Sequence, residues 1–197
     1  WRWCSFTPEN YAQKLLKTDI SKLESEYKDR KSSILQNFTA NGDINETLYT
    51  DMQLVLVNDM LTKVDLMSMA NSLEVRVPFL DHELVNFAFQ LPAEYKVSKD
   101  GRKRILKDAF RDVLPTELYS RNKMGFEVPL LQWFKSDLKS LILDDLLLDE
   151  FIEEQNIFNI DTIRGLKKQL FSSNPGEIHA QIWALIVFQT WYKKYMI

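Results

Sequence analysis

The sequence comprises 197 residues, 45% hydrophobic and 27% charged, with a formal net charge of -3. This composition is ordinary for a soluble globular protein and gives no general attraction to nucleic acid. The single cysteine, Cys4, excludes a disulfide framework and a multi-cysteine zinc site, and it favours a cytoplasmic location. The longest apolar run, 183–188, is too short to cross a membrane.

The first part of the chain predicts helices separated by short turns. Thr7 and the proline that follows it form a helix-start signal for a helix to about Leu16. Thr18 or Asp19 can cap a second helix that runs through Ile34. The turn 41–43 precedes a third helix.

The third helix, from about Glu46, carries a stripe of apolar residues at steps of three and four: Tyr49, Met52, Leu56, Met60, Val64 and Met67. The stripe is expected to face the core, with its methionines as filling side chains. Asp59 and Lys63 lie beside it, four residues apart, as expected for a surface ion pair.

The helix ends near Asn71, and the segment 73–77 alternates apolar and charged residues. Glu74 and Arg76 lie there among apolar neighbours, where they would be costly to bury unless they are paired or used in chemistry. A structural pair and a site are equally consistent with this pattern. Pro78 and Asp81 then signal the start of another helix.

The second half of the chain continues with helices over about 82–89, 102–113, 129–134, 146–153 and 161–171. The helix over 102–113 is expected to bury Leu106, Ala109, Phe110 and Val113. A last helix, from about Glu177, places Trp183, Val187 and Trp191 on one line, with Ile182, Ile186 and Tyr195 nearby. So wide an apolar face is expected to be buried. The sequence therefore predicts an all-α fold.

Basic residues provide the remaining site candidates. Lys103 is expected in the first turn of its helix, where free backbone N–H groups and a lysine together can bind an anion. Arg121 and Lys123 lie in an irregular segment with Gly125, a setting that can wrap an oxyanion or a phosphate. Spacing alone favours solvated basic residues at all three positions.

Other constellations are weaker. His82 and His179 have no partners at zinc-binding spacing. None of the glycines forms a phosphate-binding loop motif. The acids around 144–150 are expected to form a solvated face and not a metal site.

Five motifs occur in a specific order: DMLTKVD (59–65), SMA (68–70), LEVRVPFLD (73–81), KRILK (103–107) and RNKMGF (121–126). In this order they resemble the C-terminal part of the synthetase domain of glutamine-hydrolysing asparagine synthetases. The resemblance is specific over about 55–133 and weaker to the C-terminus. It implies that residues 1–197 form the helical C-terminal portion of an α/β domain of the adenine nucleotide α-hydrolase (ATP pyrophosphatase) type.

The resemblance implies a reaction in which aspartate is adenylated by MgATP and ammonia from glutamine then displaces AMP to give asparagine. It implies that Lys123 and Lys103 bind ATP phosphates and stabilise the charge on the leaving pyrophosphate, and that Glu74 assists proton transfer. Lys63, Arg76 and Arg121 are implied as substrate-binding residues.

The family's S-G-G-x-D-S loop, its Mg²⁺-binding acids and its N-terminal glutaminase cysteine have no match here. The isolated chain is therefore expected neither to adenylate aspartate nor to hydrolyse glutamine. Two alternatives remain open: a related ligase that forms another amide or a lactam, and a non-catalytic helical binding module. No surface stripe predicts an oligomeric state.

Overall fold

The computed structural model describes residues 7, 9–18, 20–36, 38–39, 42–99, 101–121, 125 and 128–197, with only the backbone of residues 9, 10 and 21–23. The chain divides into two compact units, residues 1–27 with 126–197 and residues 28–125. Helix α2 (Ser21–Leu35) crosses the border between them. The fold is mostly helical, as predicted, with one small antiparallel hairpin.

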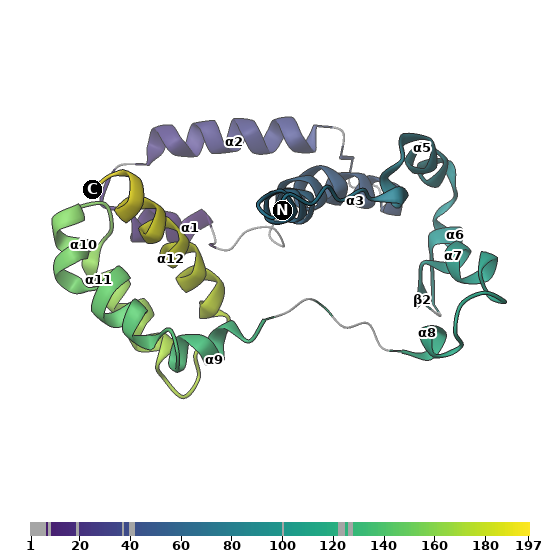
Figure 1. Cartoon of the computed structure of the whole chain (residues 1–197). Helices are drawn as coiled ribbons and strands as arrows, with labels where there is room; N and C mark the ends of the chain where they lie inside the picture. The colour runs from purple at the N-terminus through teal and green to yellow at the C-terminus, as the bar shows by residue number, and fades with distance from the viewer. Residues whose placement is uncertain are drawn as a thin grey trace. The chain divides into compact units, whose positions relative to one another are not determined.

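Six helical elements lie wholly within the described part of the first unit and pack around one apolar core. Figure 1 labels α1, α9, α10, α11 and α12 among them. They are α1 (Glu9–Leu15), α9 (Leu130–Lys135), η4 (Leu141–Leu146), α10 (Asp149–Gln155), α11 (Ile160–Leu170) and α12 (Ile178–Tyr195). Fully buried side chains from five of these elements meet in the core, among them Phe134, Ile142, Ile152, Ile163 and Ile182. This burial makes the hydrophobic effect the main stabilising term of the unit.

The chain after α1 is joined to the connection between α10 and α11. The amide of Lys17 donates to the carbonyl of Ile157 (2.9 Å), and the amide of Asn159 donates to the carbonyl of Leu15 (2.8 Å). Lys17 Nζ also donates to Asn156 Oδ1 (2.9 Å). These bonds fix an N-terminal segment to a part of the chain that is distant in sequence.

The last helix, α12, is packed as predicted, through one part of its wide apolar face. Ile178, Ile182 and Leu185 are buried, whereas Trp183 is 39% and Val187 is 50% exposed. The predicted wide apolar face is therefore buried at Ile182 and Ile186, whereas its line of Trp183, Val187 and Trp191 is exposed. Because the helix is apolar nearly all round, its sequence does not select one face, and the packing of α9, η4 and α11 against it does.

A buried glutamine on α12 is paired across the core. Gln189 is fully buried and exchanges two hydrogen bonds with Gln155 of α10, at 2.7 and 3.0 Å. Each amide satisfies the other, which removes the cost of an unpaired buried polar group.

After the end of α2, the second unit continues with a continuous helical segment of α3 (Ile44–Asp51), the π-helix η2 (Met52–Leu61) and α4 (Thr62–Met69). A short 3₁₀ helix, η3 (Pro78–Leu80), leads to α5 (His82–Gln90), whose first turn is capped by Asp81 as predicted. The remaining elements are α6 (Ala93–Lys96), β1 (Val97–Ser98), β2 (Gly101–Arg102), α7 (Arg104–Ala109) and α8 (Glu117–Ser120).

No described residue between 28 and 125 is buried. The apolar stripe of the long helical segment was predicted to be core, yet Tyr49, Val64 and Met67 are 43%, 37% and 62% exposed. Two residues of the stripe, Met52 and Met60, are half-buried, so the periodicity does mark a less exposed side of the helix. The prediction fails because the described part of this unit provides no layer to cover the stripe.

Helix α7 is shorter than predicted and buries less. It ends at Ala109, and the chain then forms turns in which the amides of Val113 and Leu114 donate to the carbonyl of Phe110. Phe110 is 46% and Val113 is 75% exposed, so neither is a core residue of this unit.

Of the described helices, none is long and apolar enough to span a membrane.

Candidate functional site

The irregular segment 73–77 begins where α4 is terminated by a Schellman motif. The amides of Ser72 and Leu73 donate to the carbonyls of Met69 (2.9 Å) and Ser68 (3.0 Å). Ser72 takes the left-handed conformation (φ 57°) that glycine usually occupies at this position. The helix cannot continue through this residue, and the segment that follows is neither helix nor strand.

Glu74 and Arg76 form an ion pair within this segment, between Glu74 Oε1 and Arg76 Nη2. The pairing considered from the sequence is therefore present. A buried setting is wrong, because the two side chains are 66% and 86% exposed and their apolar neighbours are exposed as well. A pair this exposed contributes at most about 1 kcal/mol to stability.

Lys63 lies on α4 with an exposed side chain. Its Nζ lies 3.9 Å from the sulfur of Met60, one turn earlier. The side chain thus follows the helix surface over the apolar stripe.

Lys103 lies one residue before α7, as its N-cap, and not in the first turn as predicted. Its backbone is left-handed (φ 60°, ψ 36°), and its carbonyl accepts a hydrogen bond from the amide of Lys107 (3.0 Å). A non-glycine residue in this conformation costs roughly 1–2 kcal/mol and persists only where the surrounding chain determines it. The side chain is exposed.

Arg121 follows α8 in an extended conformation, and its amide donates to the carbonyl of Glu117 (3.0 Å). Its side chain is exposed. Lys123 lies outside the described residues, so its predicted position is not compared.

Among the described residues, the Glu74–Arg76 pair is the only contact between two of these candidates. Nor do the described residues contain a group of three or more His, Cys, Asp or Glu side chains placed to hold a metal ion.

Sequence reasoning missed a pocket of about 460 Å³ beside the β1–β2 hairpin. Four basic residues line it: Arg102, Arg104, Lys107 and Arg111. The sequence carried one signal for this pocket, a high local density of positive charge. Residues 96–111 contain two acids, Asp100 and Asp108, and seven basic residues: Lys96, Lys99, Arg102, Lys103, Arg104, Lys107 and Arg111.

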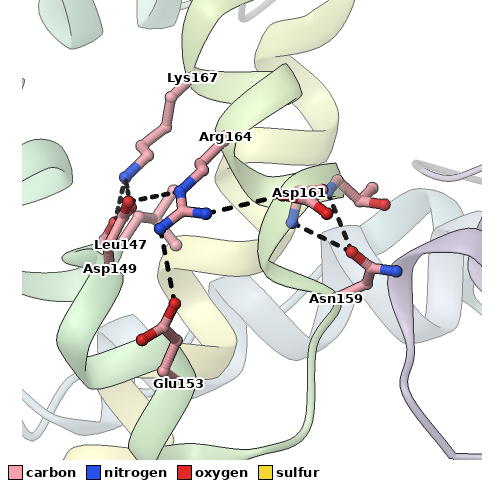
Figure 2. Close-up of polar contacts among 8 residues, drawn as sticks. Leu147, Asp149, Glu153, Asn159, Asp161, Arg164 and Lys167 are labelled. Carbon is pink, nitrogen blue, oxygen red and sulfur yellow. Dashed lines mark hydrogen bonds and ion pairs between the residues drawn. The ribbon is translucent and has the colours of Figure 1, made fainter.

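The acids around α10 form ion pairs, and Asp149 is the centre of the network (Figure 2). Arg164 Nε donates to Asp149 Oδ2 (2.6 Å), and Lys167 Nζ donates to Asp149 Oδ1 and to the carbonyl of Leu147 (2.7 Å). Glu153 and Asp161 also contact Arg164, at 3.5 and 3.6 Å. Asp149 is half-buried, so the predicted solvated face is only partly correct at this position.

The hydrogen bond from Lys167, followed by the one from Arg164, lowers the pKa of Asp149 below its ordinary value. A lowered folded-state pKa stabilises the fold above the unfolded-state pKa of about 3.9, and that contribution is lost as the pH falls through the folded-state value. We expect Asp149→Asn to reduce the free energy of unfolding by about 1 kcal/mol at pH 7. We expect the difference from the unsubstituted chain to shrink below about pH 4.

Urea unfolding of the 197-residue chain at several pH values, followed by tryptophan fluorescence, measures this effect. The signal reports on the first unit, since residues 28–125 contain no tryptophan. Asp161→Asn is the matched control: it changes the same charge beside the same arginine, but its side chain is 87% exposed. A pH-independent loss for Asp149→Asn, or an equal loss for Asp161→Asn, would contradict the prediction.

Comparison with known proteins gives consistent matches. The asparagine synthase family description matches residues 2–193. The chain is 28% identical over 178 residues to the glutamine-hydrolyzing asparagine synthetase 1 of Bacillus subtilis, covering 86% of this chain and 27% of that protein. It is 29% identical over 184 residues to synthetase 3 of the same organism, covering 85% of this chain and 28% of that protein.

A shorter match, 36% identical over 101 residues, links the chain to the glutamine-hydrolyzing asparagine synthetase of Gallus gallus, covering 47% of this chain and 18% of that protein. No solved structure gave a significant match. The chain thus spans a little over a quarter of the length of the two Bacillus proteins. Since the family description covers nearly the whole sequence, this chain belongs to the asparagine synthase family.

Proposed function

We propose that this chain supplies part of the synthetase site of a cytoplasmic, ATP-dependent asparagine synthetase. The reaction adenylates the side-chain carboxylate of aspartate with release of pyrophosphate, and glutamine-derived ammonia then displaces AMP. The observation that carries the proposal is the family match over residues 2–193, which includes all five ordered motifs.

The proposed roles follow the chemistry of each side chain. Lys103 and Lys123 bind the phosphates of ATP and stabilise the charge on the leaving pyrophosphate. Glu74 assists proton transfer during attack by nitrogen. Lys63, Arg76 and Arg121 are the proposed substrate-binding cations, and their exposed side chains are accessible to small anions.

The second unit supports a role within a larger domain. Its described residues include exposed apolar side chains such as Leu66, Met67 and Phe79, at 57%, 62% and 63%. We propose that other segments of the synthetase domain cover this surface and complete the site. The described residues include cations suited to phosphate but no acid cluster suited to Mg²⁺, so we assign that ion to other segments. The 197-residue chain alone is proposed to be inactive.

Glu74→Gln in the intact enzyme tests the proposal. We expect turnover with ammonia as the nitrogen donor to fall about 100-fold, because glutamine cannot transfer the proton. The midpoint of thermal unfolding should stay unchanged, because the Glu74–Arg76 pair is exposed. Asparagine formation and a thermal melt measure the two effects.

Glu83→Gln, an exposed acid on α5, is the control and should keep full activity. Arg76→Ala should remain soluble and lose at most about 1 kcal/mol of stability, with any effect on activity seen in KM. Normal turnover of Glu74→Gln would refute the role of Glu74. Insoluble Arg76→Ala protein would instead assign the pair a structural role.

A further inference from the structure

A second pocket lies within the first unit, between α1, the connection from α10 to α11, α11 and α12. Its volume is about 240 Å³. Aliphatic side chains such as Leu15, Ile157, Leu166 and Leu185 form much of its wall, and none of the described residues that line it is charged. A charged ligand would lose its hydration here without compensation, so the lining favours an uncharged one.

Hydrogen bonds between α1 and the α10–α11 region hold two walls of this pocket together. Leu16 and Phe158, which both line the pocket, form an antiparallel backbone bridge. Thr162 Oγ1 of α11 also donates to the carbonyl of Lys14 on α1 (2.9 Å). Because these bonds fix the walls before anything binds, a ligand does not have to order the pocket.

Aromatic rings form another part of the wall. Phe158 and Phe188 make an edge-to-face pair, with ring centroids 5.3 Å apart and ring planes at 86°. Tyr11 of α1 contributes a third ring, and burial raises the pKa of its hydroxyl, which keeps that group uncharged. Aromatic side chains bind other flat rings through offset-stacked and edge-to-face contacts, so the wall favours an aromatic ligand.

One polar atom of the lining has no partner. Gln181 Oε1, on α12, is buried and accepts no hydrogen bond from the described part of the chain. Gln189 of the same helix is also buried, yet it exchanges two hydrogen bonds with Gln155. An unpaired buried acceptor destabilises a fold, so its presence in the wall of a pocket indicates a site for a hydrogen-bond donor.

We propose that this pocket binds a small, uncharged aromatic molecule of one or two rings that carries one hydrogen-bond donor, such as indole or a phenol. The rings of the ligand contact Tyr11, Phe158 and Phe188, and its N–H or O–H donates to Gln181 Oε1. The size follows from the volume, since an apolar cavity of about 150 Å³ binds benzene. Water fits less well, because it needs several polar partners and the lining is mostly apolar.

The proposal goes beyond the synthetase reaction proposed above. The candidates for that reaction, between positions 63 and 123, belong to the second unit, whereas the pocket lies in the first. Aspartate, ammonia and ATP are charged or strongly polar, so they are not ligands of an uncharged apolar pocket. Binding here can be measured without asparagine formation, and either proposal can fail while the other stands.

An NMR titration of the 197-residue chain, labelled with ¹³C at its leucine methyl groups, tests the proposal. We expect indole to bind about tenfold more tightly than benzofuran, which has the same shape but an acceptor oxygen in place of the N–H donor. The methyl signals of Leu15, Leu166 and Leu185 should shift on binding. Those of Leu147, a fully buried leucine outside the lining, should not.

Two further compounds test the chemistry of the ligand. Indole-2-carboxylate adds a negative charge to the indole ring, and adenosine adds a ribose and several polar ring atoms. Both should bind at least tenfold more weakly than indole, because the lining offers no charge and few polar partners.

Substitutions on α12 test the assigned contacts. Gln181→Met removes the acceptor with little change in volume, so it should weaken indole binding about tenfold and leave benzofuran binding unchanged. Ala184→Leu adds carbon atoms inside the pocket and should abolish binding of both compounds. Ala180→Leu, the same change one turn earlier and outside the lining, is the matched control and should bind both like the unsubstituted chain. Gln181→Met keeps the test valid if Ala184→Leu unfolds.

The proposal is overturned if indole does not bind, or if benzofuran, indole-2-carboxylate or adenosine binds as tightly as indole. It is also overturned if the pocket leucines do not shift, or if Gln181→Met keeps the full preference for indole over benzofuran. A loss of binding in Ala180→Leu equal to that in Ala184→Leu would likewise contradict the assigned location.

Discussion

Replacing Lys123 with alanine in the intact enzyme is expected to lower turnover about 1,000-fold while leaving the free energy of unfolding nearly unchanged. The expectation rests on the proposed role of Lys123 at the leaving pyrophosphate, since removing one preorganised charge-stabilising group typically costs 100- to 1,000-fold in kcat. The residue lies in a segment of the sequence without helical or strand periodicity, where one lysine contributes little to stability. Aspartate-dependent pyrophosphate release and asparagine formation measure the loss.

Two further variants test whether the loss of turnover is specific to the charge and geometry of Lys123. Lys168→Ala removes an exposed lysine of α11 in the first unit and should keep full turnover. Lys123→Arg keeps the charge but changes its geometry, so it should recover only part of the activity. Turnover of Lys123→Ala equal to that of the unsubstituted enzyme would refute the assigned role.

Ile182→Ala is expected to reduce the free energy of unfolding of the first unit by about 2–5 kcal/mol. Ile182 is fully buried, and truncation leaves a cavity that its neighbours fill only partly. The neighbouring predicted core residue, Val187, is 50% exposed, so Val187→Ala should cost less than about 1 kcal/mol. Urea unfolding of the 197-residue chain, followed by tryptophan fluorescence, compares the two.

The comparison decides which face of α12 is the core face. A larger loss for Val187→Ala than for Ile182→Ala would contradict the observed packing. Trp183 lies next to Ile182 in sequence and stacks on Phe134, with ring centroids 6.5 Å apart. Its fluorescence is thus a local probe of the same region.

The site candidates show which structural features can be predicted from neighbouring residues in the sequence. Glu74 and Arg76 lie two residues apart in one irregular segment, so their pairing could be predicted from spacing alone. Their exposure was not, because apolar neighbours in sequence do not establish that another layer covers them. Lys103 was one residue from its expected place, since a left-handed backbone is not visible in the residue type.

The sequence by itself determined the features that arise from local interactions. Most of the longer helices were predicted, because caps such as Asp81 bond to amides two and three residues later. The short helices α6 and α8 and the π-helix η4 were not predicted, since 93–100 was expected to be a loop and 118–129 to be irregular. The ordered motifs over 59–126 pointed to the family that the comparisons then showed.

Only the tertiary structure decided which apolar faces are buried, which acids are paired and where cations converge. Ile182 and Val187 are both apolar, but only Ile182 is buried. Asp149 resembles its neighbouring acids in sequence, but it is the centre of an ion-pair network. Arg102 and Arg111 are nine residues apart in sequence, but they line the same pocket. Burial, ion pairing and pocket formation depend on contacts between elements, which helical periodicity does not specify.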